Sequence, residues 1–427
     1  MAKETNVALR NQVMYCVYVR NHTEEGTFRA LMEDLPRIRA LGTDVIWLMP
    51  IHPIGVAGKK GSLGCPYAVR DYRAVNPAYG TMEDFRRLVE EIHRLGMRCI
   101  IDVVYNHTAP DSWLAAHHPE WFFHRPDGSL GNRVADWSDV VDLDYSNRGL
   151  WDYQIESLRL WAEIVDGFRC DAASMVPVDF WREAREACAK VKGDLLWLAE
   201  SVHADFVREL RSLGVPCWSD GELYPVFDVT YDYDIWAWYE GYLRREISLG
   251  TYVDILRLQD GLYPANYVKL RCLENHDRPR IAGLAGDGRR LENFTAFQMF
   301  QKGMALVYAG QEWANVHTPS LFEKDVVDRE TGTDLSPLLR RLAEIRRDEL
   351  LARGSWEQRA EGGLVYSRYR LGDRMLCGLF CLEGEGGSAA MELPDGEYPE
   401  LLRGGTVTVS GGRAVSLGKP LLFGGTL

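Results

Sequence analysis

The sequence lacks three features that would place the protein in a membrane, in an oxidising compartment or on nucleic acid. No apolar run approaches the ~20 residues that span a bilayer, and the opening MAKETNVALR holds no apolar core of signal-peptide length. The nine cysteines follow no paired or CxxC spacing, and an odd number cannot all pair within one chain. The net charge of −13 argues against nucleic acid and anionic membrane surfaces, which attract basic patches. We therefore expect a cytoplasmic protein with buried free thiols that binds neither nucleic acid nor membrane.

Signatures of other chemistries are also missing, because the sequence has no P-loop, no zinc-ligand spacing and no GxGxxG motif opening a helix after a strand. The glycines of GLAGDGRR (283–290) fit a loop after the seventh strand. The composition, with 46% hydrophobic and 26% charged residues, is that of an ordinary globular protein. A chain of 427 residues is long enough for two or three domains, or for one large α/β barrel with an appendage. Its 13 Trp and 20 Tyr suit a neutral ligand that binds by ring stacking.

Strand-like apolar runs alternate with runs of helical period through most of the chain. The expected strands are 13–19, 44–50, 97–106, 165–173, 194–201, 226–232, 268–277 and 303–310. The expected helices include 28–42, 82–96, 150–164, 180–191 and 333–352. Eight such units joined by short connections indicate an α/β fold, a closed (β/α)₈ TIM barrel with its helices outside.

Two segments interrupt this alternation. Residues 108–146 are rich in His, Pro, Trp and Asp and look irregular, and a loop of that length in a compact domain is usually functional. After about residue 353 the helical period ends, and turn signals separate short strand-like runs. We expect 1–107 and 147–352 to form the barrel, 108–146 to form an insert after the third strand, and 353–427 to form a small antiparallel β domain.

Polar residues stand at the ends of several strands. In RCIIDVVYNHTAP (98–110), Asp102 lies within a buried run, where an unpaired carboxylate costs several kcal/mol. Active sites of such barrels lie at the carboxyl ends of the strands, so we expect one shared site there. Its predicted members are Asp102, Arg169, Asp171, Glu200, His276 and Asp277.

Each of these residues also has a purely structural interpretation, as a satisfied buried carboxylate, an ion pair or a packed histidine. Four such coincidences at four strand ends favour chemistry instead, and three carboxylates with one Arg and two His suit glycoside hydrolysis with retention. Asp171 would be the nucleophile, with a pKa lowered by Arg169, and Glu200 the acid, with a pKa raised by neighbouring carboxylates. His107 and His276 are predicted to bind sugar hydroxyls.

The polar segments resemble those of the α-amylase family, glycoside hydrolase family 13, over nearly the whole barrel. The matching segments are DVVYNH (102–107), GFRCDAAS (167–174), LAES (198–201) and ENHD (274–277). The resemblance implies Asp171 as the nucleophile and Glu200 as the acid/base. It implies Asp277 as the residue that binds ring hydroxyls and tunes Glu200.

The resemblance also implies the surroundings of the reacting sugar. His107, Arg169 and His276 would line its subsite, Tyr67 would stack on its ring, and Asp102 would support Arg169. The insert would be the family's domain B, and the last segment its β-sandwich. Four aromatic residues of the insert are candidates for sugar stacking, with simple packing onto the barrel as an equal alternative: Trp113, Trp121, Phe122 and Trp137.

The sequence departs from the family at the acceptor side of the cleft. Ser174 and Met175 stand where a Lys-His pair is common, which removes a cation and a hydrogen bonder from the leaving glucan. The backbone at that His commonly joins an Asn, here Asn106, in binding calcium. We therefore expect no cofactor, with calcium at Asn106 as the candidate exception. We also expect few strong acceptor subsites and a preference for short oligosaccharides over starch.

The leading prediction is a retaining hydrolase of maltooligosaccharides or related α-1,4-glucans. A glucanotransferase or a disaccharide-rearranging enzyme of the same family would use the same residues, because only the acceptor of the glycosyl group differs. A non-catalytic sugar-binding or transporter subunit is the alternative from another class. Chain-length preference and oligomeric state stay open.

Overall fold

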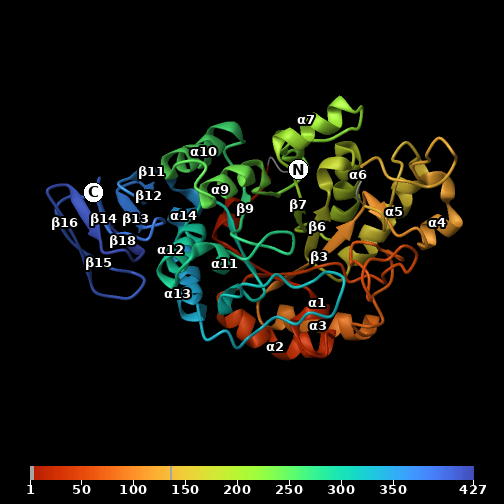
Figure 1. Cartoon of the computed structure of the whole chain (residues 1–427), viewed down its shortest axis with the longest axis horizontal. Coiled ribbons are helices and arrows are strands. Elements are labelled where there is room, and N and C mark those ends of the chain that lie inside the picture. Colours follow the sequence, from red (N-terminus) through yellow and green to blue (C-terminus); the bar gives the residue numbers. More distant parts are fainter. Residues whose placement is uncertain (1–3, 135–136) are drawn as a thin grey trace.

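The computed structural model describes residues 4–134 and 137–427 and shows a closed barrel of eight parallel strands (Figure 1). Around the barrel the strands are β1 (Val13–Val17), β2 (Val45–Leu48), β3 (Arg98–Val104), β6 (Gly167–Asp171), β7 (Leu196–Ala199), β8 (Val229–Tyr231), β9 (Lys269–Arg271) and β10 (Met304–Tyr308). Each lies within a segment that the sequence predicted as a strand, so the predicted TIM barrel is confirmed. β1 pairs with β10 as well as with β2, which closes the sheet.

Helices surround the outside of the barrel. They are α1 (Val19–His22), α2 (Phe28–Ala40), α3 (Met82–Arg94), α5 (Arg148–Ala162), α6 (Val178–Ala189), α7 (Ala204–Ser212), α8 (Asp220–Leu223), α9 (Trp236–Leu243), α10 (Leu249–Leu262), α11 (Ile281–Ala285), α12 (Gly288–Met299), α13 (Ser336–Arg346) and α14 (Glu349–Arg353). α3 shows how the sequence specifies one of them. Thr81 and Asp84 form a reciprocal capping box at its start, and Phe85, Leu88 and Ile92 on one face are fully buried.

Two predictions of local structure are wrong. The segment 333–352 was predicted as one helix, but the structure divides it into α13 and α14 because the Asp348 side chain accepts the amide proton of Leu350 and caps a new helix. The glycine-rich segment 283–290 was predicted as a loop, but it contains the end of α11 and the start of α12. Gly286, with φ of 85°, separates these two helices, and Asp287 caps the second.

The insert is less irregular than the sequence indicates. It contains the short strands β4 (His107–Thr108) and β5 (Val141–Asp142), which pair antiparallel with His107 opposite Asp142. It also contains α4 (Trp113–His117) and a 3₁₀ turn at Pro119–Trp121. Because β4 follows β3 after two residues, this ladder fixes the first residue of the insert at the mouth of the barrel.

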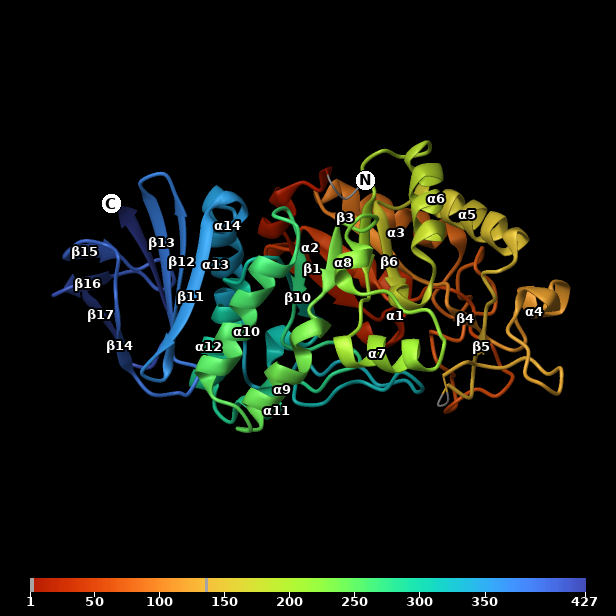
Figure 2. The same ribbon diagram turned by 90° about the horizontal axis from the view of Figure 1, so that it is seen from above.

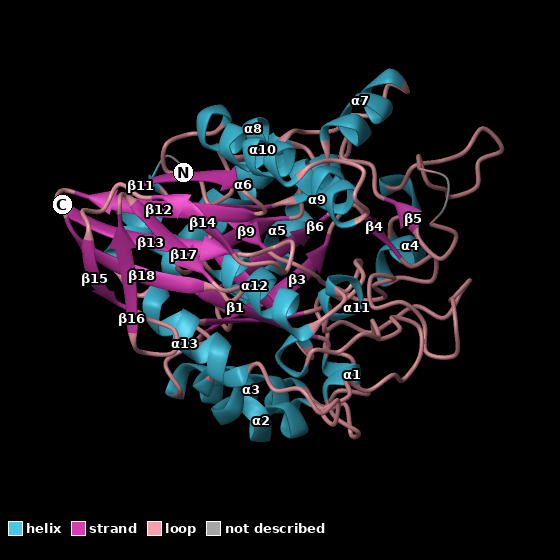
Figure 3. Cartoon of the chain, turned by 60° about the vertical axis from the view of Figure 1, so that its left-hand side comes forward, coloured by secondary structure: helices cyan, strands magenta, loops and turns pink. Residues whose placement is uncertain are grey.

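The C-terminal segment forms two antiparallel sheets of four strands each. One has the order β11 (Ser355–Glu361), β12 (Leu364–Leu371), β13 (Arg374–Phe380) and β18 (Leu421–Thr426). The other has the order β14 (Gly387–Ala390), β17 (Arg413–Ser416), β16 (Thr406–Ser410) and β15 (Gly396–Pro399). The two sheets share a core in which Tyr366 and Leu379 of the first pack with Val409 and Ala414 of the second. Figures 2 and 3 show this sandwich at the opposite end of the molecule from α4 and the insert.

The structure also bears on membrane-spanning helices and on the cysteines. Among the described residues no helix combines the length and the apolar character that crossing a bilayer requires. All nine cysteines lie in the described part and are free thiols, and Cys99 and Cys170 are fully buried in β3 and β6.

Candidate active site

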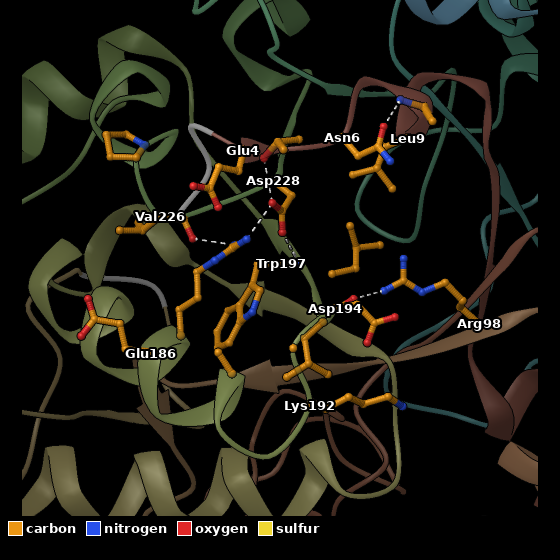
Figure 4. Close-up of a pocket in the computed structure, with 18 of the residues that line it drawn as sticks. Glu4, Asn6, Leu9, Arg98, Glu186, Lys192, Asp194, Trp197, Val226 and Asp228 are labelled. Carbon is orange, nitrogen blue, oxygen red and sulfur yellow. Dashed lines mark hydrogen bonds and ion pairs between the residues drawn. The ribbon is translucent and has the colours of Figure 1, made fainter.

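One pocket lies at the amino ends of the strands, away from the end where barrel enzymes place their chemistry. It has a volume of about 520 Å³ and is lined by Arg98 at the start of β3, Trp197 in β7 and Asp228 just before β8 (Figure 4). Asp228 accepts hydrogen bonds from Arg185 at 2.7 Å and from the Thr5 hydroxyl at 2.7 Å. These two bonds stabilise the amino end of the barrel and require no ligand. The predicted site residues lie at the opposite end of the strands.

Arg169 is the centre of the polar cluster at the carboxyl ends of the strands. Its side chain is fully buried in β6, and the strand register places it opposite Asp102 of β3. Arg169 Nη1 lies 2.9 Å from Asp102 Oδ1 and 2.8 Å from Asp171 Oδ1. Nη2 lies 2.9 Å from Glu200 Oε1, a charge contact that lacks hydrogen-bond alignment. One guanidinium therefore contacts three carboxylates that the sequence predicted to converge.

Three aromatic rings surround the same guanidinium. The centre of the Arg169 guanidinium lies 5.2 Å from the ring of Trp47, 5.6 Å from that of Tyr67 and 5.3 Å from that of Tyr231. The Tyr231 hydroxyl accepts a hydrogen bond from Arg169 Nε at 3.1 Å. Trp47 and Tyr231 were not among the predicted site residues, because neither carries a local signal of this contact with Arg169.

Tyr67, His276 and Asp277 form a second group beside this cluster. The Tyr67 hydroxyl donates to Asp102 Oδ2 at 3.0 Å and lies 2.7 Å from His276 Nε2, and the two rings stack with centroids 5.5 Å apart. His276 Nε2 lies 3.1 Å from Asp277 Oδ2. β9 ends at Arg271, so the prediction that His276 and Asp277 belong to the strand is wrong, and these two residues lie in the loop that follows.

His107 reaches the nucleophile candidate from the insert side. Its Nε2 lies 3.9 Å from Asp171 Oδ2, and its Nδ1 lies 3.2 Å from the side-chain amide of Asn106. Burial lowers the pKa of His107 to about 4, so the imidazole is neutral at pH 7. A neutral imidazole here can hydrogen-bond a sugar hydroxyl without adding charge to the site.

Ala172 turns the chain from the nucleophile candidate toward the acid candidate. Its φ of 45° lies in the left-handed region, which is uncommon for a residue with a side chain. In this conformation the Ala172 amide donates to Glu200 Oε2 at 2.7 Å. The strained residue thus connects the backbone beside Asp171 to the carboxylate of Glu200.

The carboxylates differ in their proton affinity. Burial raises the pKa of Asp171 to about 6, and the opposing charge of Arg169 lowers it, as predicted, without offsetting the effect of burial. Burial, with the charges of Asp171 and Asp277, raises the pKa of Glu200 to about 7. For Asp277 burial acts in the same direction, but His276 and Arg169 outweigh it and lower the pKa to about 2. Near neutral pH, Asp171 is mostly ionised while Glu200 keeps a proton in a large fraction of molecules.

These pKa values predict a narrow bell-shaped pH profile. We expect kcat/KM to fall below pH about 6, as Asp171 gains a proton, and above pH about 7, as Glu200 loses one. Asp277→Asn removes a negative charge that raises the pKa of Glu200, so its alkaline limb should move to lower pH. Initial rates measured between pH 4 and pH 9 test this, with Asp228→Asn at the far end of the barrel as the control. An alkaline limb that is unmoved in Asp277→Asn would contradict the assignment of that limb to Glu200.

Asn106 is the residue at which the sequence predicts a metal ion, if one is bound. Among residues 4–134 and 137–427, no group of three or more His, Cys, Asp or Glu side chains is arranged to bind one. The guanidinium of Arg133 lies beside the insert ladder, with Nη1 3.0 Å from the Leu143 carbonyl and 3.9 Å from Asp142 Oδ2. This cation thus lies close to the buried carboxylate of Asp142.

The four aromatic candidates of the insert separate in the structure. Trp137 lies beside the site, with its ring centroid 5.1 Å from that of His107. Trp113 stacks on Tyr153 of α5 at 5.3 Å, Trp121 stacks on His118 at 3.8 Å, and Phe122 is buried. Packing explains these three, which leaves Trp137 as the candidate sugar contact.

Comparison with known proteins agrees with this geometry. The family model described as "Alpha amylase, catalytic domain" matches residues 18–138 and 132–369. The model described as "Bacterial Alpha amylase C-terminal domain" matches residues 356–423. The solved structure of an α-amylase from Lactobacillus plantarum is 44% identical with a TM-score of 0.97, and the match covers 99% of this chain and 100% of that one. A noncanonic maltogenic α-amylase from Thermotoga neapolitana is 34% identical with a TM-score of 0.88 and coverage of 98% and 100%.

Curated relatives include enzymes with transferase names. The α-1,4-glucan:maltose-1-phosphate maltosyltransferase 1 of Streptomyces coelicolor is 34% identical over 200 residues, which are 42% of this chain and 30% of that protein. The α-amylase MalA of Haloarcula japonica is 27% identical over 323 residues, 71% of this chain and 44% of that protein. This chain thus spans less than half the length of these two relatives. From the catalytic-domain match, the C-terminal match and the barrel site together, the chain belongs to the α-amylase family, glycoside hydrolase family 13.

Proposed function

We propose that this chain is a retaining enzyme that cleaves α-1,4-linked glucose oligosaccharides through a covalent glycosyl-enzyme on Asp171. The observation that carries the proposal is the pair of carboxyls on one guanidinium, Asp171 and Glu200, with pKa values of about 6 and about 7. An ionised nucleophile beside a protonated acid is the combination that a retaining glycosidase requires.

The residues divide the reaction between them. Asp171 attacks the anomeric carbon while Glu200 donates its proton to the leaving glycosidic oxygen, so the C–O bond breaks as the ester to Asp171 forms. Glu200, now ionised, takes a proton from water, whose oxygen attacks the anomeric carbon and releases Asp171. Neutral His107 and ionised Asp277 bind sugar hydroxyls as positive charge develops on the ring. Arg169 keeps the two reacting carboxylates in place, and no step requires a metal ion.

Hydrolysis and glycosyl transfer share these residues and differ in whether water or a sugar receives the glycosyl group. Two solved structures that this chain covers completely are named α-amylases. The maltosyltransferase match spans 42% of this chain and 30% of that relative. We therefore propose hydrolysis as the main reaction, with transfer to a second sugar as the alternative.

An apolar cluster that includes residues shortly after Asp171 and Glu200 in the chain supports a preference for short substrates. Val134 of the insert, Met175 after the nucleophile and Val202 after the acid pack against a cluster formed by Val207, Leu210 and Cys217 at α7 and the loop after it. Ser174 is fully buried, so its hydroxyl cannot meet an acceptor sugar. The acceptor side thus offers apolar surface where a polar glucan would need hydrogen bonds, which favours few strong acceptor subsites.

Time courses on maltoheptaose, starch and maltose 1-phosphate test the proposal. We expect shorter linear products from maltoheptaose with the α-anomer appearing first, because two inversions at the anomeric carbon restore its configuration. Catalytic efficiency per cleavable bond should be higher on maltoheptaose than on starch. Early products longer than maltoheptaose, or rapid use of maltose 1-phosphate, would identify a transferase. A β-anomer as the first product would refute the retaining mechanism.

A further inference from the structure

A buried lysine stands at the centre of an ion cluster that the proposed reaction does not use. Lys269 begins β9, and its side chain is fully buried. Its Nζ lies 2.9 Å from Asp220 Oδ1 in α8, 2.9 Å from Asp234 Oδ1 and 2.9 Å from the carbonyl of Tyr231 in β8. An ammonium group has three donors, so each donor of Lys269 has a partner. Taking such charges out of water costs several kcal/mol, which packing alone does not explain.

The cluster reaches the acid candidate through Ser201. This serine directly follows Glu200, is fully buried, and donates its hydroxyl to Asp220 Oδ1 at 2.8 Å. The same carboxylate oxygen accepts from Lys269. The position of the chain just after Glu200 therefore depends on a carboxylate that the lysine fixes.

The cluster also reaches Arg169 through Tyr231. Lys269 binds the main-chain carbonyl of Tyr231, and the hydroxyl of the same tyrosine accepts from Arg169 Nε at 3.1 Å. Arg169 in turn lies 2.9 Å from Glu200. The ammonium group of Lys269 therefore fixes the position of Ser201, which follows Glu200, and the position of Tyr231, which binds Arg169.

A second network explains why helix packing does not need this lysine. Arg271 Nη1 bonds Asp232 at 2.8 Å and Gln259 of α10 at 2.6 Å, which joins β9 to α10 independently. Asp234 has further donors in Gln259 at 2.9 Å and the Tyr263 hydroxyl at 2.7 Å. The other two bonds of Lys269 go to Asp220, which also accepts from Ser201, and to the Tyr231 carbonyl, to which the Ser201 hydroxyl also donates at 3.4 Å.

We propose that Lys269 is a positioning residue of the active site, which acts through Asp220 and Ser201 on Glu200 and through Tyr231 on Arg169. The proposal rests on the proposed function, since it gives Glu200 the role of acid/base. Lys269 touches neither substrate nor reacting atoms. Its effect is to keep the acid and the guanidinium in the 2.9 Å arrangement that catalysis needs.

Ser201→Ala tests the connection with one lost hydroxyl. We expect kcat to fall about tenfold with KM changed by less than about twofold, because a small displacement of the acid slows the chemistry while the sugar contacts remain. The alkaline limb of kcat/KM should move to lower pH, as a less constrained Glu200 becomes better solvated. Ser201→Thr keeps the hydroxyl and should restore most of kcat. Ser157→Ala is the control, a fully buried serine in α5 whose hydroxyl donates to the Tyr153 carbonyl at 2.8 Å.

Lys269→Met leaves Asp220 and Asp234 without their cation, so this variant can fail to fold. Asp220→Asn is therefore the second variant. The loss of kcat in Asp220→Asn should not add to that of Ser201→Ala in the double variant, because both substitutions break the same connection. An active parent whose Ser201→Ala variant keeps its kcat and its alkaline limb would overturn this proposal alone. So would full additivity of the two losses. A parent that turns over none of the α-glucans would instead contradict the proposed function.

Discussion

Asp171→Asn and Glu200→Gln are each expected to lower kcat by about three orders of magnitude or more, because each removes a group that acts only in the transition state. The amide of Asp171→Asn cannot attack the anomeric carbon. The amide of Glu200→Gln has no acidic proton for the leaving oxygen. Single-turnover and steady-state rates on maltoheptaose measure both effects, and a variant that keeps more than about a tenth of the parent kcat would contradict its assigned role.

The same two variants should not lose stability. Burial raises the pKa of both carboxyls above the ordinary range, so at neutral pH each charged form is unfavourable in the folded state. A neutral amide of the same shape removes that cost, and the melting temperature should stay the same or rise. Asp228→Asn is the matched control at the amino end of the barrel, where the buried carboxylate pairs with Arg185 at 2.7 Å. Its kcat should stay within about threefold of the parent, since Asp228 lies far from the chemistry.

The barrel and the centre of the site could be predicted because local sequence determines them. Alternating residues of a strand share a face, so Arg169 and Asp171 had to lie together, and the structure separates their charged atoms by 2.8 Å. The rule that barrel sites lie at the carboxyl ends of strands then joins Asp102 and Glu200 to that pair. Asp102 stands opposite Arg169 in the register of β3 and β6.

What could not be predicted depends on contacts between distant parts of the chain. The ladder of β4 and β5 has two residues in each strand and exists because His107 meets Asp142, 35 positions later. Tyr231 and Lys269 carry no local signal of their function, since each is recognisable only when the packing of β8 and β9 is known. The net pKa of Asp171 also depends on burial, which the sequence does not measure, so the lowering by Arg169 could be predicted but the larger rise from burial could not.

Arg169→Met is expected to have the largest combined effect on stability and activity. The substitution keeps an apolar side chain of similar length but leaves Asp102, Asp171 and Glu200 without their common cation, and Asp102 is fully buried. Removing one partner of a buried ion pair typically costs about 3–5 kcal/mol, because the remaining charge stays desolvated. We expect a fall in the free energy of unfolding of that order, measured by denaturant titration at pH 7. We also expect a kcat lower by at least about a hundredfold, since both reacting carboxylates lose their alignment.

The stability loss in Arg169→Met should shrink as the pH falls. A carboxyl whose folded-state pKa is raised above its unfolded value binds more protons when folded, so the protein gains stability below the unfolded pKa and loses it as the pH rises through the folded pKa. Burial already raises the pKa of Asp102 and Asp171 to about 6 and that of Glu200 to about 7, each against the opposing charge of Arg169. Without Arg169 these pKa values rise further, so the difference in melting temperature from the parent should be large at pH about 8 and small at pH about 4.5.

Arg271→Met is the control, because the buried guanidinium of Arg271 lies 2.8 Å from the single carboxylate of Asp232. It should lose stability while kcat per folded molecule changes by less than about threefold, as expected for a buried ion pair outside the reacting group. An Arg169→Met variant whose stability difference is the same at both pH values would show that the three carboxylates are not the groups that Arg169 neutralises.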